Sequence, residues 1–548
     1  MGEVVIGPLL RHVGSSNATV WVETDQPCEV EVLGSRERTW SVAGHHFALV
    51  LVEGLTPGSS TPYEVRLDGE VAWPPPDSVR PPSRIRTLAE ARPVRIAFGS
   101  CRYATAAAVP DDNHFDADSL ACYARTLAAL NEDTWPDALL MLGDQVYADE
   151  TSEATQRRIR ARRDSNEGAG TEVADFEEYT WLYAESWLDP DVRWLMSTVG
   201  TSMIFDDHDV RDDWNTSHLW REDMAREPWW QERIVGALSS YWIYQHLGNL
   251  SPGELAENDL YQRVRAHQGD SEQLLRQFAA TADREADGAK GTRWSFRRDF
   301  GRVRLVMIDS RCGRILAEGS RSMVSESEFS WIEEQVRGDY DHLLIGTSLP
   351  WLLPRALHDI ESWNEVLCSG ARGSRMARWG EKMRRAADLE HWASFRKSFD
   401  RLAALLASVG RGERSGLDGG CPATICVLSG DVHHAYVAQA HYDERVDAQI
   451  YQLTCSPLHN YVPTAMKVAF RVSWSKPAER ATRRLLGLVA KLPPMTIGWN
   501  RVAGPYFGNE IVTLTFDGRR ADSVLERSAP SNVASELTEV GRVNLSSG

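Results

Sequence analysis

The stretch DALLMLGDQVYAD, residues 137–149, places a continuous apolar run directly before a glycine and four side chains that carry oxygen. Such a run is typical of a strand buried on both faces of a sheet, as in α/β architectures. In these folds the functional groups lie just past the strand ends. The stretch therefore predicts a buried strand that ends at a site.

Five other stretches repeat this pattern of an apolar strand followed by a polar loop. They are VRIAFGSCR (94–102), TSMIFDDHD (201–209), VRLVMIDSR (303–311), HLLIGTSLPW (342–351) and ATICVLSGDVHH (423–434). Between them, segments 151–200, 223–290 and 361–409 are predicted to be helical insertions. The pattern indicates an α/β domain with helices between its strands.

The two ends of the chain have sequence patterns that differ from that of the middle part. Residues 4–70 contain short alternating stretches, such as NATVWVET, that predict a small fibronectin-like β-sandwich. The proline-rich segment 73–87 is expected to connect it to the rest. We therefore divide the chain into a sandwich domain (1–88), an α/β domain (89–528) that ends in a hairpin at 509–526, and a loose tail (529–548).

The composition indicates a soluble globular protein, with 42% hydrophobic and 25% charged residues among 548. The formal net charge of −18 argues against nucleic acid as a stable partner. No apolar run is long enough for a transmembrane helix, and the first residues do not form a secretory signal. The eight cysteines are scattered and form no Cys-x-x-Cys pair, so a reducing, cytoplasmic location is expected.

Four strand ends carry side chains that bind metals or move protons: GSCR, GDQVYAD, DDHD and SGDVHH. Each alone has an ordinary explanation, because Gly-Asp is a common turn and a single His is more often a packing residue. Together they match the needs of a two-metal hydrolase, which takes ligands from several loops and a bridging carboxylate. Asp206 and Asp209 are expected to shape the turn around this site.

The series GSCR, GDQVYAD, DDHD, LPW and SGDVHH, behind a β-rich module, resembles the PhoD-like alkaline phosphatase family of the calcineurin-like metallophosphoesterase superfamily. The resemblance spans nearly the whole chain and includes DLEHWASF at 388–395. It implies a four-layer α/β/β/α sandwich behind the N-terminal β-sandwich. It also implies a binuclear or multinuclear metal centre.

The resemblance assigns one metal ion to four residues: Cys101, Asp144, Tyr147 and His433. Asp144 is the bridging carboxylate, and Cys101 stands where many relatives have Asp-x-His. A thiolate, a phenolate and an imidazole around one ion favour Fe(III).

The second ion is expected on Asp144, Asp207 and Asp431. This all-oxygen set favours Ca²⁺, with Mn²⁺ or Mg²⁺ as a substitute. His208 then lies beside the ions, as expected for a general acid to the leaving group. Substrate contacts are expected from Arg102, whose planar fork suits phosphate, and from His434.

The function implied is a metal-dependent phosphoesterase that hydrolyses small phosphomonoesters, phosphodiesters or both through a metal-activated hydroxide. One alternative is a phosphodiesterase for nucleotide or lipid-derived diesters, and another is a catalytically idle metal-containing binding protein. The chain departs from the family pattern at Asp212 and Asp213, where relatives often have paired asparagines. Arg311 and Arg314 follow a strand where they either reach phosphate or pair with carboxylates.

Residues 464–491 reverse the charge of the chain, with seven basic residues and one acidic residue. Peripheral membrane contact through an amphipathic helix is one interpretation of this segment. The interpretation we favour from the sequence is a helix packed on the domain with a solvated basic face.

Overall fold

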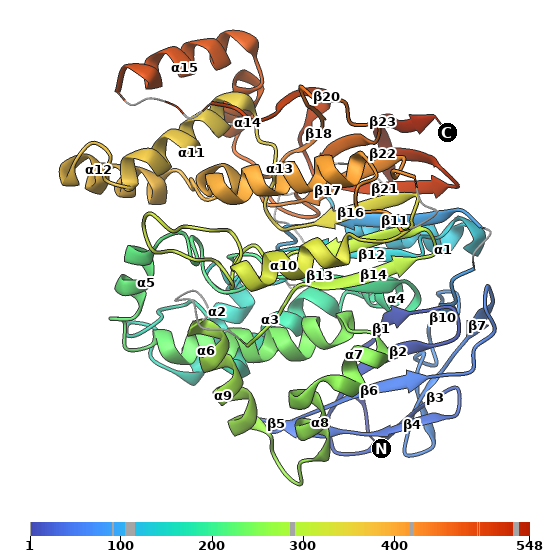
Figure 1. The fold of residues 1–548 in the computed structure, drawn as a ribbon. Coiled ribbons are helices and arrows are strands. Elements are labelled where there is room, and N and C mark those ends of the chain that lie inside the picture. Colours follow the sequence, from blue (N-terminus) through green and yellow to red (C-terminus); the bar gives the residue numbers. More distant parts are fainter. Residues whose placement is uncertain are drawn as a thin grey trace.

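The computed structural model describes residues 2–89, 92–104, 116–284, 291–416, 420–489, 492, 494–529 and 536–547. Within these ranges, an N-terminal β-rich part lies against a larger α/β part built on two central sheets (Figure 1). The division at residue 88 stays a prediction.

The N-terminal part consists of two four-stranded antiparallel sheets and a two-stranded pair. The sheet orders are β1-β2-β6-β5, β4-β3-β8-β9 and β10-β7. Alternate side chains of these strands point into a shared aliphatic core, as the alternating sequence predicted. The strands are β1 (Val4–Val13), β2 (Ala18–Thr24), β3 (Glu29–Val32), β4 (Ser35–Arg38), β5 (Trp40–Val42), β6 (His45–Val52), β7 (Ser60–Pro62), β8 (Val65–Leu67), β9 (Glu70–Trp73) and β10 (Arg84–Arg86).

Arg11 fastens this sandwich to the rest of the protein. Its side chain is fully buried and donates hydrogen bonds to the backbone oxygens of Tyr244, at 2.8 Å, and Gln245, at 2.6 Å. Gly248 leaves the space, because a Cβ atom there would lie 2.2 Å from Arg11 Nε. The two parts therefore share a polar anchor as well as apolar contacts.

A second link between the two parts depends on pH. Nδ1 of His45 lies 2.7 Å from Glu23 Oε1, and Nε2 lies 2.9 Å from Glu177 Oε2. Burial alone would lower the pKa of His45, but the two carboxylates raise it to about 9. The link is therefore strongest when His45 carries a proton.

We expect this link to weaken in alkali. The pKa of His45 is raised above its unfolded value of 6.5, so its contribution to stability is complete below about pH 6.5 and is lost as the pH rises through about 9. The largest contribution consistent with these values is about 3 kcal/mol. Urea unfolding between pH 6.5 and 9.5 should show a larger loss of stability for the wild type than for His45→Gln. Parallel curves for the two proteins would contradict the prediction.

Two sheets form the centre of the α/β part. A six-stranded sheet has the order β13-β12-β11-β21-β22-β23, and a seven-stranded sheet has the order β14-β15-β16-β17-β19-β18-β20. All six apolar stretches singled out in the sequence are strands here. The bounds are β11 (Val94–Gly99), β12 (Ala138–Leu142), β13 (Gly200–Ile204), β14 (Phe296–Phe300), β15 (Val303–Met307), β16 (His342–Gly346), β17 (Thr424–Ser429), β18 (Ala435–His441), β19 (Gln449–Thr454), β20 (Gly498–Tyr506), β21 (Glu510–Asp517), β22 (Arg520–Ser528) and β23 (Leu537–Ser547).

Helices cover the outer faces of both sheets. One core lies between the sheets and joins residues such as Phe98 and Leu140 to Leu344 and Leu428. Two further cores pack α1, α3, α4 and α6 on the six-stranded sheet and α10 and α13 on the seven-stranded sheet. The expected four-layer α/β/β/α arrangement is therefore confirmed.

The predicted insertions are helical where the structure describes them. The α-helices are α1 (Ser119–Ala129), α2 (Glu153–Arg162), α3 (Phe176–Trp187), α4 (Pro190–Thr198), α5 (His218–Met224), α6 (Trp230–Tyr241), α7 (Pro252–Glu257), α8 (Asp259–Ala266), α9 (Glu272–Asp283), α10 (Glu326–Gln335), α11 (Arg355–Cys368), α12 (Ser374–Ala386), α13 (Arg396–Gly410), α14 (Thr464–Ser473) and α15 (Lys476–Val489). Short helical turns are η1 (Glu132–Thr134), η2 (Trp242–His246), η3 (Leu247–Asn249) and η5 (Trp392–Ser394).

In the described ranges, no helix combines the length and the apolar character needed to cross a bilayer. All eight cysteines are free thiols.

The prediction of a loose C-terminal tail is wrong for residues 537–547. They form β23, which pairs antiparallel with β22 from Leu537 opposite Ser528 to Ser547 opposite Arg520. The backbone groups of an edge strand are open to pairing, and β23 satisfies those of β22. The hairpin predicted at 509–526 is present as β21 and β22, and it continues the six-stranded sheet beside β11.

Candidate metal centre

The carboxyl ends of parallel strands from both central sheets meet where the two sheets face each other. β11, β12 and β13 run parallel in one sheet, and β15, β16 and β17 run parallel in the other. The loops after β11 and β12 bind each other through Cys101 N and Gly143 O, 3.1 Å apart. Across the sheets, Asp431 N donates to Ser100 Oγ at 3.3 Å. The four polar clusters predicted from the sequence are thus brought to one place.

Two glycines make this convergence possible. A Cβ atom at Gly143 would lie 2.6 Å from the Cβ of Asp206, and the backbone there has a φ of 107°. A Cβ atom at Gly430 would lie 1.9 Å from Ser100 Oγ. Any larger residue at either position would push the loops apart.

Four of the predicted ligands have left-handed backbone conformations. The φ angles are 56° at Cys101, 50° at Asp144, 67° at Asp431 and 46° at His433. Such conformations are costly for residues with a Cβ atom and concentrate at functional sites. The strained backbone conformations therefore occur at residues that the sequence predicted to be metal ligands.

Three buried carboxylates form the centre of the site. Asp144, Asp206 and Asp207 each offer an oxygen, and these oxygens all lie within 4.8 Å of one another. Oδ1 of Asp144 and Oδ2 of Asp206 are buried and have no hydrogen-bond partner. Among the described residues, no cationic side chain forms an ion pair with Asp144. Carboxylates in this state repel one another, and a cation relieves the repulsion.

The pKa values reflect this repulsion. Burial raises the pKa of Asp144 well above its usual range, and the charges of Asp206, Asp207 and Asp209 add to the effect. Burial also raises the pKa of Asp206, although Arg311 opposes it. The donor set and the unpaired oxygens both fit a hard multivalent cation.

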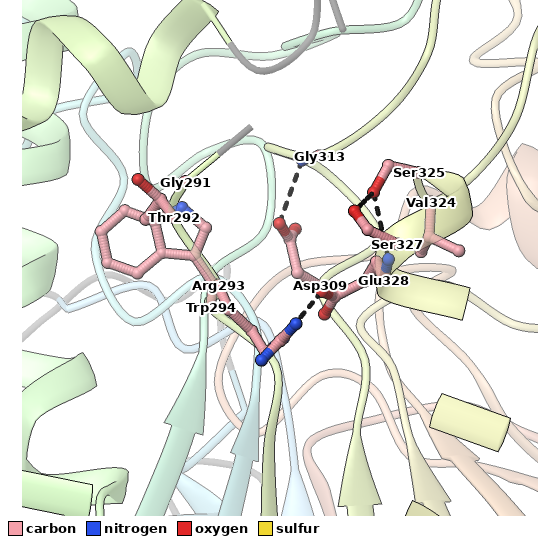
Figure 2. Close-up of a pocket in the computed structure, with 10 residues that line it drawn as sticks. All are labelled: Gly291, Thr292, Arg293, Trp294, Asp309, Gly313, Val324, Ser325, Ser327 and Glu328. Carbon is pink, nitrogen blue, oxygen red and sulfur yellow. Dashed lines mark hydrogen bonds and ion pairs between the residues drawn. The ribbon is translucent and has the colours of Figure 1, made fainter. Parts of the chain in front are cut away.

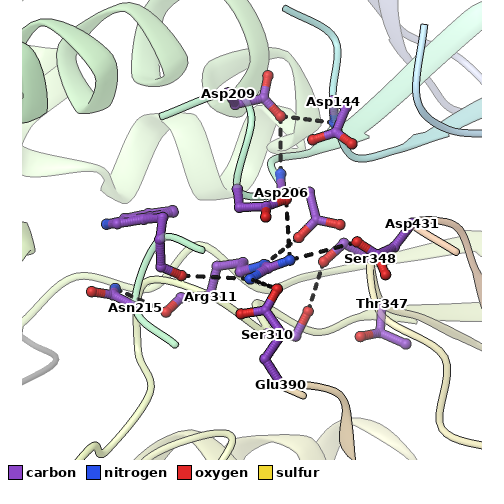
Figure 3. A network of polar contacts seen from close by, with 12 residues as sticks. Asp144, Asp206, Asp209, Asn215, Ser310, Arg311, Thr347, Ser348, Glu390 and Asp431 are labelled. Carbon is purple, nitrogen blue, oxygen red and sulfur yellow. Dashed lines mark hydrogen bonds and ion pairs between the residues drawn. The ribbon is translucent and has the colours of Figure 1, made fainter. Parts of the chain in front are cut away.

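Arg311 is the hub of the polar network on one side of this group (Figure 3). Its side chain is fully buried; Nε donates to Asp206, Nη2 lies 3.1 Å from Asp207 Oδ1, and Nη1 lies 2.6 Å from Glu390 Oε1. Nη2 is also 3.6 Å from Asp431 Oδ1. Of the two roles left open for Arg311, pairing with carboxylates is the one observed.

Neighbouring groups fix the position of Arg311. The carboxylate of Asp309 accepts the backbone N–H groups of Arg311, Cys312 and Gly313 at 2.8, 2.9 and 3.0 Å. Arg314 pairs with the second oxygen of Glu390 at 3.2 Å. Asp309 also lines a cavity of about 150 Å³, whereas the carboxylates paired with the Arg311 guanidinium do not line it (Figure 2). This cavity is therefore separate from the metal centre.

The aspartates of DDHD divide between two roles. Asp209 shapes the loops, as expected, because it accepts the backbone N–H groups of Asp144 at 2.9 Å, Gln145 at 3.2 Å and Asp206 at 2.9 Å. Asp206 was expected to share this role. Its carboxylate instead belongs to the acidic group with Asp144 and Asp207.

The other predicted ligands surround this group. The Cys101 thiol lies 3.8 Å from the backbone oxygen of Asp431, and burial, together with the charges of Asp144 and Asp431, raises its pKa. The hydroxyl of Tyr147 accepts a hydrogen bond from Asn460 at 2.9 Å. Asp431 pairs with His391 at 2.8 Å. Neither His391 nor Asn460 was predicted to belong to the site, because His391 lies in a turn between helices and Asn460 comes several positions after the end of β19.

His208 is held by a carboxylate that the sequence did not connect to it. Nδ1 lies 2.9 Å from Asp149 Oδ1, and the ring lies 4.7 Å from that of Tyr147. Burial would lower the pKa of His208, but Asp149 raises it well above its usual range. The backbone N–H groups of Asp212 and Asp213 bind Asp149 at 2.5 Å and Asp207 at 3.2 Å. The two unexplained aspartates thus support the site through their backbone.

Neither predicted substrate contact is supported by its surroundings. Arg102 is buried, donates to Asp118 Oδ2 from Nε and Nη2 at 2.9 and 2.7 Å, and also binds Ser186. Asp118 in turn caps α1, so this pair serves the fold. His434 is buried and stacks against Phe470, with ring centroids 4.3 Å apart.

The chain is similar to known proteins in sequence and in fold. The model of the family described as PhoD-like phosphatase matches residues 113–485. A domain of unknown function, DUF7800, matches residues 1–85. No curated protein matches the chain.

Two solved structures are similar to this fold. One is described as the structure of PhoD, with a TM-score of 0.57 and 11% identity over 100% of this chain and 92% of that chain. The other is the purple acid phosphatase PPD1 from yellow lupin (Lupinus luteus) seeds, with a TM-score of 0.46 and 11% identity over 97% of this chain and 73% of that chain. At this identity the first likeness establishes the fold.

Proposed function

The chain belongs to the PhoD-like phosphatase family, and we propose that it hydrolyses small phosphate esters at a metal centre built on Asp144, Asp206 and Asp207. The observation that carries this proposal is the group of three buried carboxylates with two unpaired oxygens. A multivalent cation would relieve their mutual repulsion, and bound metal ions can activate water for the hydrolysis of a phosphate ester.

We assign the remaining ligands by type. The thiol of Cys101, the phenol of Tyr147 and the imidazole of His433 suit Fe³⁺, with Asp144 shared between two ions. Asp206, Asp207 and Asp431 suit Ca²⁺, with Mn²⁺ or Mg²⁺ as substitutes. When bound, these ions would activate a water molecule and neutralise charge on the phosphoryl group.

The partly exposed residues mark the entrance for the substrate. His208, Asp431 and His433 keep some exposure, whereas Cys101 and Asp144 are buried. An ester that enters there would come close to His208. Arg102 and His434 are not carried into this proposal, and a cytoplasmic location stays a prediction.

Hydrolysis assays with two aryl esters test the function. Protein loaded with Fe³⁺ and Ca²⁺, or with Mn²⁺, should hydrolyse p-nitrophenyl phosphate, bis(p-nitrophenyl) phosphate or both, and chelation should stop the reaction. The ratio of the two rates separates a monoesterase from a diesterase. Folded, metal-loaded protein that cleaves neither ester would support the idle binding protein.

We propose that His208 donates the proton that the leaving oxygen takes up. Its pairing with Asp149 at 2.9 Å orients the ring, and although burial opposes it, Asp149 raises the pKa of His208. General acid catalysis matters most for a poor leaving group. His208→Gln should therefore slow the hydrolysis of an alkyl phosphate by about 10²- to 10⁴-fold and the hydrolysis of an aryl phosphate far less.

Asp149→Asn should show the same selectivity to a smaller degree, because the imidazole remains. Metal content measured by elemental analysis should stay unchanged in both variants. Equal losses on the alkyl and the aryl ester would contradict the role as proton donor.

A further inference from the structure

The helices α14 and α15 carry a concentration of exposed apolar side chains. Of the fifteen large apolar residues exposed in the described chain, six lie between residues 461 and 488. Leu485 is 65% exposed and Leu488 is 81% exposed. The six are Tyr461, Met466, Val468, Val472, Leu485 and Leu488. Single exposed apolar residues are ordinary, but a group of this size marks an interaction surface.

The inner face of α15 packs against α11, and its opposite face is exposed to solvent. Leu486 packs on the core of α11 formed by Trp363 and Leu367. Glu479 pairs with Arg355 of α11 at 3.3 Å. α15 is therefore seated on the domain, as the sequence suggested, and Figure 1 shows it at the edge of the molecule beyond α11.

The outer face of α15 mixes basic and apolar residues. Lys476, Arg480 and Arg484 are exposed, and none of them forms an ion pair within the described ranges. They stand out in a chain with a net charge of −18. A purely solvated basic face, the interpretation favoured from the sequence, does not account for Leu485 and Leu488 beside these charges. Basic and bulky apolar residues on one amphipathic helix are typical of helices that lie in a bilayer interface.

α14 connects this surface to the metal centre. Phe470 stacks on His434, which follows the proposed ligand His433. Trp474, at the end of α14, packs against Tyr436 of β18 with ring centroids 4.9 Å apart. A contact on α14 and α15 is thus made one layer of side chains away from the site.

We propose that the outer surface of α14 and α15 docks on a lipid bilayer that contains anionic lipid. The charge of such a bilayer complements Lys476, Arg480 and Arg484, and its interface accommodates Leu485 and Leu488. A symmetric dimer through this surface would place the same basic residues of two copies against each other. The bilayer therefore fits the surface better than a second copy does.

Vesicle co-sedimentation tests the proposal without any measurement of hydrolysis. The wild type should sediment with vesicles of phosphatidylcholine and phosphatidylglycerol at low salt, and weakly or not at all with phosphatidylcholine alone. Added salt should release it, because exposed charges are screened. The variant Lys476→Glu, Arg480→Glu, Arg484→Glu should lose on the order of a hundredfold in partitioning, since each basic residue near the surface contributes roughly fivefold.

Matched variants separate charge from apolar contact. Leu485→Ser with Leu488→Ser should also reduce binding, by about tenfold or more, without a change of charge. Arg226→Glu, Arg263→Glu and Arg445→Glu make the same charge change at exposed positions elsewhere and should bind better than the α15 charge variant. Soluble-ester hydrolysis should be unchanged in all of these proteins.

Three results would overturn the proposal. The first is wild-type protein that stays in solution with anionic vesicles at low salt. The second is equal loss of binding in the α15 and control charge variants. The third is a concentration-dependent dimer, seen by light scattering, that Leu485→Ser disrupts while vesicle binding stays unchanged.

Discussion

Asp144→Asn is expected to slow hydrolysis strongly and to weaken metal binding while it stabilises the metal-free protein. Asparagine keeps the shape of the side chain and removes its charge. In the proposed centre this carboxylate would serve both ions, so its loss would remove a ligand from each. We expect the rate to fall by roughly a thousandfold, which corresponds to about 4 kcal/mol of transition-state stabilisation.

The stability gain has a separate cause. Burial and the neighbouring carboxylates raise the pKa of Asp144, so its ionised form is unfavourable in the folded protein without metal. The folded pKa lies above the unfolded value of 3.8, and the stability that the protonated group supplies is therefore lost as the pH rises through the folded pKa. At neutral pH, the neutral amide of Asp144→Asn avoids this penalty.

Elemental analysis and thermal unfolding measure the two effects together. In chelator, Asp144→Asn should unfold at a higher temperature than the wild type. Added Mn²⁺ should raise the unfolding temperature of the wild type but not that of Asp144→Asn. Asp259→Asn, at an exposed position, is the matched control and should behave as the wild type. Full metal content in Asp144→Asn would refute the assignment.

The sequence predicted the strand ends well because buried parallel strands leave a plain signal. Each of the six apolar runs became a strand, and the loops after them converge at one edge. The four-layer arrangement followed from the resemblance carried by these same loops. Local pattern and fold agree here because the site residues lie within a few positions of a strand.

The partners of these residues were harder to predict. Glu390 and His391 come from a turn after α12, and Asp149 meets His208 from a different loop. Such pairings depend on the folding of long insertions, which leave no periodic signal for their contacts. Asp206 illustrates the same limit, because its neighbour Arg311 lies 105 positions away.

The tail shows a different limit. Residues 537–547 lack a strong apolar alternation, yet they pair along β22. An edge strand is stabilised largely by backbone hydrogen bonds to its neighbour, so its sequence carries little information.

Arg311→Met is expected to destabilise the protein severely. The side chain is fully buried, and its guanidinium faces Asp206, Asp207 and Glu390. Removing one partner of a buried ion pair leaves an uncompensated charge and costs about 3–5 kcal/mol. Methionine fills much of the same space, so the loss of stability comes mainly from the missing charge and not from a cavity.

Arg321→Met provides the control for the loss of a buried arginine. Arg321 is buried and donates to the backbone oxygen of Thr216, while its nearest carboxylate, on Glu318, is 3.9 Å away. Burial lowers the pKa of Arg321 to about 9, so its charge is less favourable in the fold. We expect Arg321→Met to cost about 1–2 kcal/mol for the hydrogen bonds alone.

The dependence on pH and metal distinguishes the two variants. Without Arg311, the pKa values of Asp206 and Asp207 rise further, so protonation at low pH removes the repulsion. The stability deficit of Arg311→Met should therefore shrink as the pH falls from 8 to 5, and divalent metal should reduce it at pH 8 because a cation replaces the lost charge. Urea unfolding in chelator and in Mn²⁺ measures both effects. If the stability deficit of Arg311→Met equals that of Arg321→Met and does not change with pH or metal, Arg311 contributes packing rather than neutralisation of the acidic centre.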